Sequence, residues 1–342
     1  MNKIGLHIIR VYIQLGLFFY YNKIIVKGQS SLPKNQPILF LSNHQNGLLD
    51  ALLIATKTGR FSYFLTRAGV FKKPLVSWFL HSLNMRPVYR VRDGWNTITK
   101  NKSVFSNTVH LLHANNAVTI FPEGNHNLER RVRPLSKGFT RIILEFRLLY
   151  PNKAIQLIPI GLNYQDPKTM GSNVSVYFGE AILSKSYNHL NDFEATNRIK
   201  QDVFQSLTNL TTQIPLANYN TTLDSLNKLK VDFTNPKSVN DCILSQFKNC
   251  HTQAVKQSSL KVILKPIIYL LLCLPIFIWR HYIKPKIKEV EFLSTFRFAI
   301  SIALVPLWLL LIVATVWFAF GFAPSLMFIL TSLLLILIYN KA

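Results

Sequence analysis

The segment Ser42-Asn43-His44-Gln45-Asn46-Gly47-Leu48-Leu49-Asp50 decides the fold that we predict for this chain. The apolar run Pro37–Leu41 precedes it and is typical of a buried strand, and the apolar run Ala51–Ala55 after it is typical of a helix. A polar turn between a strand and a helix is where α/β proteins place catalytic groups. The segment therefore predicts an α/β domain with a functional turn.

His44 and Asp50 are the candidate catalytic residues of this turn. A histidine can take a proton from a hydroxyl near neutral pH, and a carboxylate can hold its ring in the productive tautomer. Asn43 could cap the following helix or contact a substrate. The alternative is an ordinary loop histidine beside a helix-start aspartate, which is the commoner meaning of such a pair taken alone.

A second strand ending supports the catalytic interpretation. The apolar run Ala117–Phe121 predicts another buried strand, which leads directly into Pro122-Glu123-Gly124. We expect this strand to bring Glu123 and Gly124 to the same edge of the sheet as His44. Glycine at position 124 would let a backbone N–H approach a ligand.

Together, the two strand endings resemble the NH(x)nD and FPEG signatures of the glycerolipid acyltransferase family, of the bacterial lysophosphatidate acyltransferase type. Four more segments resemble family segments in the same order, over about residues 30–185: Met85–Arg90, Arg133–Gly138, Leu157–Leu162 and Val176–Ile182. The resemblance implies that His44 is the general base, that Asp50 orients it, that Arg90 holds a phosphate, and that Glu123 binds the acceptor or shapes the site.

Two departures bear on the acceptor. Five residues instead of four separate His44 from Asp50, which is similar to fungal-like glycerol-3-phosphate acyltransferases. FPEG is followed by Asn125-His126-Asn127, so an arginine often assigned to phosphate binding in the family is missing. The predicted substitutes are basic residues just downstream, and a lipid-headgroup patch or a solvated basic loop is the alternative. They are Arg130, Arg131, Arg133 and Lys137.

Composition indicates a membrane partner. The 342 residues include 39 Lys and Arg against 15 Asp and Glu, a formal net charge of +24, and 49% of residues are hydrophobic. Such an excess predicts an anionic partner, and we expect a membrane with anionic lipids and no nucleic acid, because no nucleic-acid-reading motif is present. Cys242, Cys250 and Cys273 lack metal-site spacing and fit a reducing cytosol. We expect no cofactor and no bound metal.

Four regions are predicted along the chain. Residues 1–28 form an interfacial helix and a first strand, with Lys3, His7, Arg10 and Gln14 on one stripe of an otherwise apolar helix. An ordinary core helix is the alternative. Residues 29–185 form the acyltransferase-type mixed sheet flanked by helices, and residues 186–261 form a polar helical insert. Residues 262–342 form a membrane region.

The membrane region is predicted to hold a transmembrane hairpin of helices 298–320 and 325–339, joined by a turn at Gly321–Pro324. The basic segment 280–288 should be cytoplasmic. A cytoplasmic catalytic domain then requires residues 262–279 to be interfacial or re-entrant. If they span instead, the catalytic domain faces outward.

The predicted function is membrane-bound transfer of an acyl chain from acyl-coenzyme A or acyl-carrier protein to lysophosphatidate, giving phosphatidate. Glycerol-3-phosphate and a lyso-aminolipid are alternative acceptors. A lipid hydrolase and a non-catalytic lipid-binding membrane protein are alternatives from other classes. No G-x-S-x-G elbow is present, so we expect direct attack by the acceptor through a ternary complex.

Overall fold

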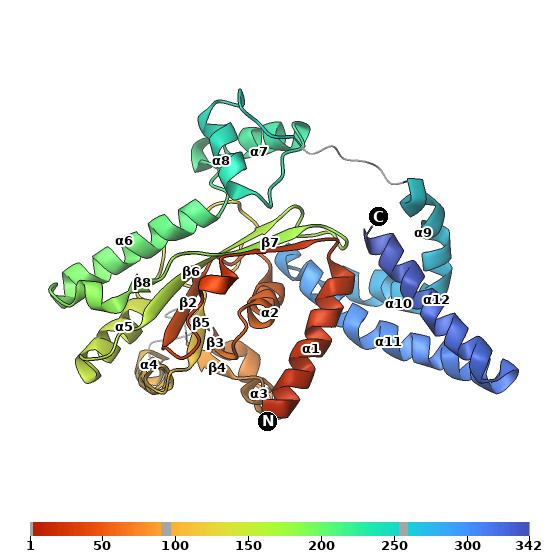
Figure 1. The fold of residues 1–342 in the computed structure, drawn as a ribbon, viewed down its shortest axis with the longest axis horizontal. Helices are drawn as coiled ribbons and strands as arrows, with labels where there is room; N and C mark the ends of the chain where they lie inside the picture. Colours follow the sequence, from red (N-terminus) through yellow and green to blue (C-terminus); the bar gives the residue numbers. More distant parts are fainter. Residues whose placement is uncertain (1–2, 90–96, 253–258, 342) are drawn as a thin grey trace.

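A computed structural model describes residues 3–89, 97–252 and 259–341 of the chain. The predicted mixed α/β sheet is present at its centre (Figure 1). Its main path runs β1-β7-β6-β2-β5-β3-β4, with β8 paired to β6. Neighbours are parallel except that β6 is antiparallel to β7 and to β8. The strands are β1 (Ile24–Lys27), β2 (Ile38–Ser42), β3 (Ser62–Arg67), β4 (Met85–Val88), β5 (Ala117–Ile120), β6 (Gln156–Tyr164), β7 (Val174–Phe178) and β8 (Ile182–Leu183).

Strand β2 is the centre of the core and is buried on both faces. Leu39 and Leu41 lie in one apolar cluster with residues of α4 (Thr97–His113), α5 (Gly138–Leu149) and α6 (Asp192–Leu210). Ile38 and Phe40 lie in a second cluster, with residues of α1 (Lys3–Tyr20) and α2 (Gly47–Lys57). Alternate side chains of a strand point to opposite faces, so a strand covered on both sides must be apolar throughout.

Helix α3 (Pro74–Ser82) follows the 3₁₀ turn Ala68–Phe71 and precedes β4. Pro74 occupies its first turn, where the missing N–H costs nothing. Its outer face exposes large apolar side chains, among them Leu75 and Trp78. Helix α1 likewise exposes Ile4 and Ile8. Both helices therefore present apolar surface outside the core, and the interfacial placement of α1 stays a prediction.

Helix α6 belongs to the catalytic fold, although the sequence interpretation assigned its residues to a polar insert. Its first turn is closed by a capping box, in which the Asn191 side chain accepts from the Glu194 N–H and the Glu194 carboxylate accepts from the Asn191 N–H. Its buried stripe packs on the sheet and on α5: Ala195, Ile199, Val203 and Leu207. The layered core therefore extends to residue 210.

Two shorter helices, α7 (Tyr219–Lys228) and α8 (Pro236–Leu244), form a small unit with an apolar core of its own (Figure 1). Cys242, at the end of α8, is joined to Cys250 by a disulfide. The expectation that these cysteines are reduced is therefore wrong for this pair. Cys273 is free and exposed.

The C-terminal region contains two helices long and apolar enough to cross a membrane, α11 (Leu293–Phe320) and α12 (Phe322–Lys341). They lie side by side and lead away from the sheet (Figure 1). The turn between them is a single residue, Gly321, with φ = +87°, so the predicted turn through Pro324 is shorter than expected.

Two helical stretches that precede α11 meet at an angle of 90°. The first is α9 (Ser259–Leu271), and the second is Cys273–Lys286, which begins with α10 (Cys273–Ile278).

Both ends of the helical hairpin are attached to the catalytic domain. At the start of α11, the Ser294 hydroxyl donates to the Pro167 carbonyl over 2.6 Å. At the end of α12, the Lys341 ammonium donates to the Tyr21 carbonyl over 2.8 Å. Gly16 of α1 faces Ile302 of α11 so closely that a Cβ at position 16 would lie 2.6 Å from its methyl group. The hairpin therefore returns to the side from which it starts.

Candidate active site

His44 and Asp50 form a contact pair at the end of β2. The Nδ1 atom of His44 lies 2.7 Å from Asp50 Oδ2. A carboxylate only accepts hydrogen bonds, so Nδ1 carries the proton and the lone pair lies on Nε2. No hydrogen bond to another described residue involves Nε2. The pair therefore has the tautomer that a general base needs, in spite of the five-residue spacing.

Asp50 is completely buried and has three donors. Besides the imidazole, Oδ2 accepts from the Asn46 backbone N–H over 2.8 Å. Oδ1 accepts from the Tyr164 hydroxyl over 2.5 Å. These bonds compensate the carboxylate for its loss of water and hold it in one orientation.

The turn between the pair is shaped by Gly47, which has φ = +49°. This left-handed conformation is easily adopted only by glycine. A side chain there would also meet α11, because a Cβ would lie 3.0 Å from Thr295 Oγ1. The next N–H, that of Leu48, donates to the same hydroxyl over 3.2 Å. The helix that starts the membrane hairpin thus contacts the catalytic turn directly.

The loop after β5 covers His44, as its position beside β2 predicts. The ring of Phe121 stacks on the imidazole with centroids 4.0 Å apart. The Asn127 N–H donates to the His44 carbonyl over 3.0 Å. Gly124 has φ = +79°, which explains the glycine, but its N–H donates to the Phe121 carbonyl. That N–H is therefore not available to a ligand in this conformation.

Glu123 is bound by Arg133, whose Nε lies 2.7 Å from Glu123 Oε2. The Glu123 side chain is 2% exposed and that of Arg133 is 12% exposed. Arg133 also donates to the side chain and the carbonyl of Asn125. Burial raises the pKa of Glu123 to about 7, and the neighbouring Arg133 opposes this shift. The other oxygen, Oε1, is buried and has no partner among the described residues.

Arg130 binds the protein's own backbone. Its guanidinium donates to the carbonyls of Tyr164, over 2.7 Å, and Gln165, over 2.9 Å. It also lies over the ring of Phe233, 3.7 Å from the centroid, and so connects the sheet to the small α7–α8 unit. Burial lowers the pKa of Arg130 to about 10. We therefore do not assign phosphate binding to it.

Among the remaining predicted basic residues, Arg131 and Lys137 make fewer side-chain hydrogen bonds within the described structure. Arg131 pairs with Glu129 over 2.8 Å, and both side chains are partly exposed. Lys137 is exposed at the start of α5. Arg90, the main phosphate candidate, lies outside the described residues. In the structure, Arg130 thus binds backbone carbonyls and Arg133 has a carboxylate partner.

Asn43 does not cap helix α2, so that prediction is wrong. The N-cap position is Asn46, which makes no side-chain capping bond. The amide of Asn43 instead spans to β6, where it donates to the Leu162 carbonyl over 3.0 Å and accepts from the Leu162 N–H over 2.8 Å. Asn43 therefore links the catalytic turn to the neighbouring strand.

Four residues near the pair were not identified from the sequence: Tyr164, His126, Phe292 and Thr295. The His126 ring lies edge-on to that of His44, with centroids 5.6 Å apart. Phe292 in turn lies edge-on to His126, with centroids 4.5 Å apart. Phe292 and Thr295 are 248 and 251 positions from His44, and no local pattern connects them. His126 was visible only as a departure from the FPEG-Thr-Arg pattern.

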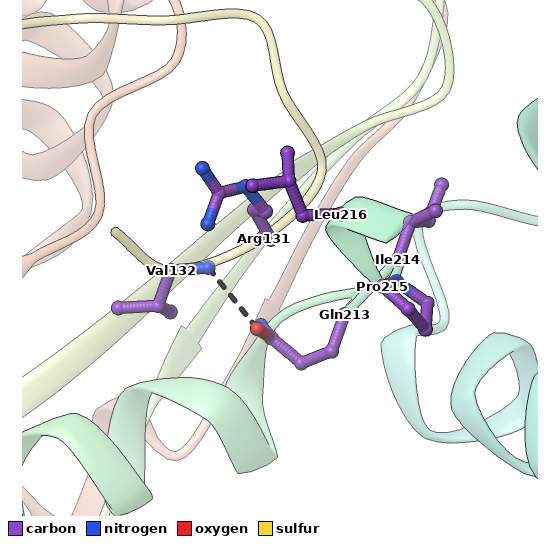
Figure 2. A pocket seen from close by; sticks show the side chains of 6 residues that line it. All are labelled: Arg131, Val132, Gln213, Ile214, Pro215 and Leu216. Carbon is purple, nitrogen blue, oxygen red and sulfur yellow. Dashed lines mark hydrogen bonds between the residues drawn. The ribbon is translucent and has the colours of Figure 1, made fainter. Parts of the chain in front are cut away.

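One hollow in the described structure lies outside this site. It has a volume of about 240 Å³ and is lined by Arg131, Val132 and residues 213–216 (Figure 2). The Gln213 side chain accepts there from the Val132 N–H over 3.1 Å (Figure 2). Because neither His44 nor Glu123 lines this hollow, we give it no catalytic role.

Comparison with known proteins agrees with the geometry. Residues 23–163 match the Acyltransferase family model, which includes both catalytic turns. Residues 23–163 thus form an Acyltransferase domain, similar to that of the glycerolipid acyltransferases.

Two curated relatives match over shorter stretches. The 1-acyl-sn-glycerol-3-phosphate acyltransferase BAT2, chloroplastic, of Brassica napus is 24% identical over 132 residues, which cover 38% of this chain and 36% of the relative. Glycerol-3-phosphate O-acyltransferase 1 of Saccharomyces cerevisiae is 28% identical over 108 residues, 30% of this chain and 14% of the relative. The matches thus span about a third and a seventh of these proteins.

Among solved structures, the 1-acyl-sn-glycerophosphate (LPA) acyltransferase PlsC of Thermotoga maritima has a TM-score of 0.42 at 17% identity. The similarity covers 58% of this chain and 78% of PlsC.

Proposed function

We propose that this acyltransferase-family protein moves an acyl chain from a thioester to a hydroxyl of a lysolipid or glycerol phosphate at a membrane, with His44 as general base. The observation that carries the proposal is the His44–Asp50 contact of 2.7 Å at the end of a central strand. It leaves a basic nitrogen, Nε2, without a partner in the described structure, beside the FPEG loop.

In the proposed reaction, His44 Nε2 takes the proton of the acceptor hydroxyl as its oxygen attacks the thioester carbonyl. A carbon–oxygen bond forms, and the carbon–sulfur bond breaks as the tetrahedral intermediate collapses. The imidazolium returns its proton to the departing thiolate. Asp50 stabilises the imidazolium in between, and no enzyme nucleophile is required.

Glu123 has a different proposed role. Its Oε2 is held by Arg133, and its Oε1 has no partner within the described part of the chain. An acceptor hydroxyl that binds to Oε1 would relieve the cost of that buried oxygen. We therefore assign Glu123 to acceptor positioning and not to proton removal. The Gly124 N–H donates to the Phe121 carbonyl, so we do not assign the oxyanion to it.

The names of the relatives point to lysophosphatidate and glycerol-3-phosphate as acceptors. Lysophosphatidate is our first proposal from the family, and phosphate binding would then fall to Arg90, Arg131 or Lys137. Arg133 would have to release Glu123 to take part, leaving a buried carboxylate unpaired, which is costly.

We propose that the catalytic domain lies on the cytoplasmic face and that α9 and α10 re-enter the membrane without crossing it. The start of α11 touches the catalytic turn through Thr295, so the basic segment before it lies on the same side as the catalytic domain. A chain that leaves and returns to one side crosses an even number of times. The 90° bend between α9 and the stretch that begins with α10 agrees with this path, and the basic segment favours the cytoplasm.

An acceptor panel tests the proposed function. Purified protein in anionic micelles receives labelled acyl-coenzyme A or acyl-carrier protein, with lysophosphatidate or glycerol-3-phosphate. We expect acyl transfer that depends on the acceptor and is lost in His44→Ala. Consumption of the donor without an acceptor would indicate a hydrolase. Transfer by His44→Ala at more than about a hundredth of the wild-type rate would exclude the general-base role.

A further inference from the structure

Helix α2 carries Asp50 in its first turn, so the start of this helix fixes where the carboxylate lies. The first N–H groups of a helix have no partner within the helix, and an N-cap side chain commonly accepts from one of them. Asn46 occupies the N-cap position but makes no such bond. Its side-chain amide donates instead to the Pro167 carbonyl over 3.0 Å. The start of α2 is therefore not capped by its own N-cap residue.

The Thr295 hydroxyl of α11 takes the place of this cap. It accepts from the backbone N–H of Leu48, the second residue of α2, over 3.2 Å. The two helices approach so closely that a Cβ on Gly47 would lie 3.0 Å from the same oxygen. The following N–H, that of Leu49, bonds within the turn to the Asn46 carbonyl. Helix α2 is thus capped by a side chain 247 positions further along the chain than the N–H that it accepts from.

Other hydrogen bonds fix the start of α11, and so give the Thr295 hydroxyl a defined position. The Ser294 hydroxyl donates to the Pro167 carbonyl over 2.6 Å, the same carbonyl that accepts from the N-cap residue of α2. The Arg297 guanidinium donates to the Lys168 carbonyl over 2.7 Å. The catalytic turn and the start of α11 are therefore attached to one loop, between β6 and β7, as well as to each other.

The first turn of α2 is connected directly to the catalytic pair. Asp50 Oδ2 accepts from the Asn46 N–H over 2.8 Å and lies 2.7 Å from His44 Nδ1. His44 is held separately, at the end of β2 and against the ring of Phe121. A shift of the helix start therefore changes the distance between the carboxylate and the imidazole. Misplacing catalytic groups by about 1 Å can cost about a hundredfold in rate.

We propose that Thr295 is a positioning residue for the His44–Asp50 pair, so that the catalytic turn is complete only when the membrane hairpin is seated on it. The hydroxyl acts through the Leu48 N–H and through the first turn of α2. The inference rests on the proposed acyl transfer. It adds to that machinery a residue outside the segment 23–163 that matches the Acyltransferase model.

Three variants of the full-length protein test this role. Thr295→Val keeps the shape of the side chain and removes the acceptor, whereas Thr295→Ser keeps the hydroxyl. Thr315→Val is the matched control, because it makes the same replacement in α11 at a hydroxyl that donates to the Ile312 carbonyl of the same helix.

The kinetic expectation is a loss of kcat without a loss of substrate binding. In anionic micelles, kcat of Thr295→Val should fall about 10- to 100-fold, while KM for the acceptor changes by less than about threefold. For Thr295→Ser, kcat should stay within about threefold of the wild-type value, because the oxygen that accepts from Leu48 is retained. Thr315→Val should change neither kcat nor KM.

A proton resonance tests the positioning role without any acyl transfer. The Nδ1–H of His44, which lies 2.7 Å from a carboxylate oxygen, should give a far-downfield proton resonance that is absent from His44→Ala. We expect this resonance to shift or disappear in Thr295→Val. It should remain in Thr295→Ser and in Thr315→Val. No substrate is needed for this measurement.

The outcomes separate this inference from the proposed function. An unchanged kcat or an unchanged resonance in Thr295→Val overturns the inference and leaves the role of His44 intact. Equal losses in the valine and serine variants also overturn it, since serine keeps the acceptor. A raised KM with unchanged kcat would place Thr295 in substrate binding instead. If the wild type transfers no acyl chain but the resonance is lost only in Thr295→Val, the proposed function fails and the positioning role of Thr295 stands.

Discussion

Replacing Asp50 by asparagine should separate the charge of this residue from its geometry. The amide can place its oxygen at the Oδ2 position and keep the bonds from His44 and from the Asn46 N–H. Its NH2 group then faces the Tyr164 hydroxyl, which can rotate and accept. The His44 tautomer is preserved in this arrangement, and the variant lacks only the negative charge.

The expected loss follows from the energy of that charge. Two unit charges about 4 Å apart at an effective dielectric constant of about 20 interact by about 4 kcal/mol. Each 1.36 kcal/mol corresponds to a factor of about ten in rate. We therefore expect Asp50→Asn to lower kcat by about a thousandfold, with little change in KM, because the charge acts on the imidazolium formed during transfer.

The assay is release of free thiol from an acyl thioester with saturating acceptor, with membrane binding and thermal unfolding measured on the same samples. Tyr164→Phe is the control, since it removes one donor to Asp50 but keeps the charge. It should reduce stability by about 1 to 3 kcal/mol and activity by less than tenfold. If Asp50→Asn keeps more than a tenth of the activity, Asp50 does not stabilise an imidazolium, and the proposed mechanism fails.

Three further predictions concern other parts of the structure. His44→Ala should remain folded and membrane-bound while transfer falls by at least a hundredfold, as measured with the labelled donor; loss of folding would leave the residue a structural role. Because of Glu123, the free energy of unfolding should fall as the pH rises from about 4.5 to about 7. The folded protein binds the Glu123 proton more tightly than the unfolded chain does. The free energy of unfolding of Glu123→Gln, measured by urea titration, should therefore rise by about 3 kcal/mol relative to that of the wild type across this pH range. A difference between the two proteins that does not depend on pH would contradict the raised pKa. Gly16→Leu should destabilise the contact of α1 with α11 by about 1 to 3 kcal/mol in detergent, since Ile302 leaves no room, and unchanged unfolding would show that this contact is loose.

The pairing of Glu123 with Arg133 changes the meaning of the basic cluster. Counted along the sequence, the cluster is a dense positive patch suited to phosphate. In the folded chain, Arg133 neutralises a buried carboxylate and Arg130 binds carbonyls. Charge counted along a sequence does not reveal how much of it remains available.

The contact between the catalytic turn and α11 likewise exists only in the folded chain. The Leu48 N–H of the turn depends on the Thr295 hydroxyl, and Phe292 packs on His126. The membrane helices therefore form part of the wall of the proposed site. Removal of residues 290–342 should thus impair catalysis even in protein that still binds membranes through α1.

The sequence by itself determined the features that depend on neighbours along the chain. The complete burial of β2 and the loop at the end of β5 follow from continuous apolar runs. The juxtaposition of His44 with Asp50 follows from the strand end and the first turn of one helix.

Only the tertiary structure decided which polar groups satisfy one another. Asn43 binds Leu162 across the sheet, Arg133 binds Glu123, and His126 meets two glutamates more than 160 positions away. Burial makes such partnerships obligatory, because an unpaired polar group inside a protein is costly. Which partner is chosen depends on how distant segments pack, and no local periodicity in a single sequence contains that information.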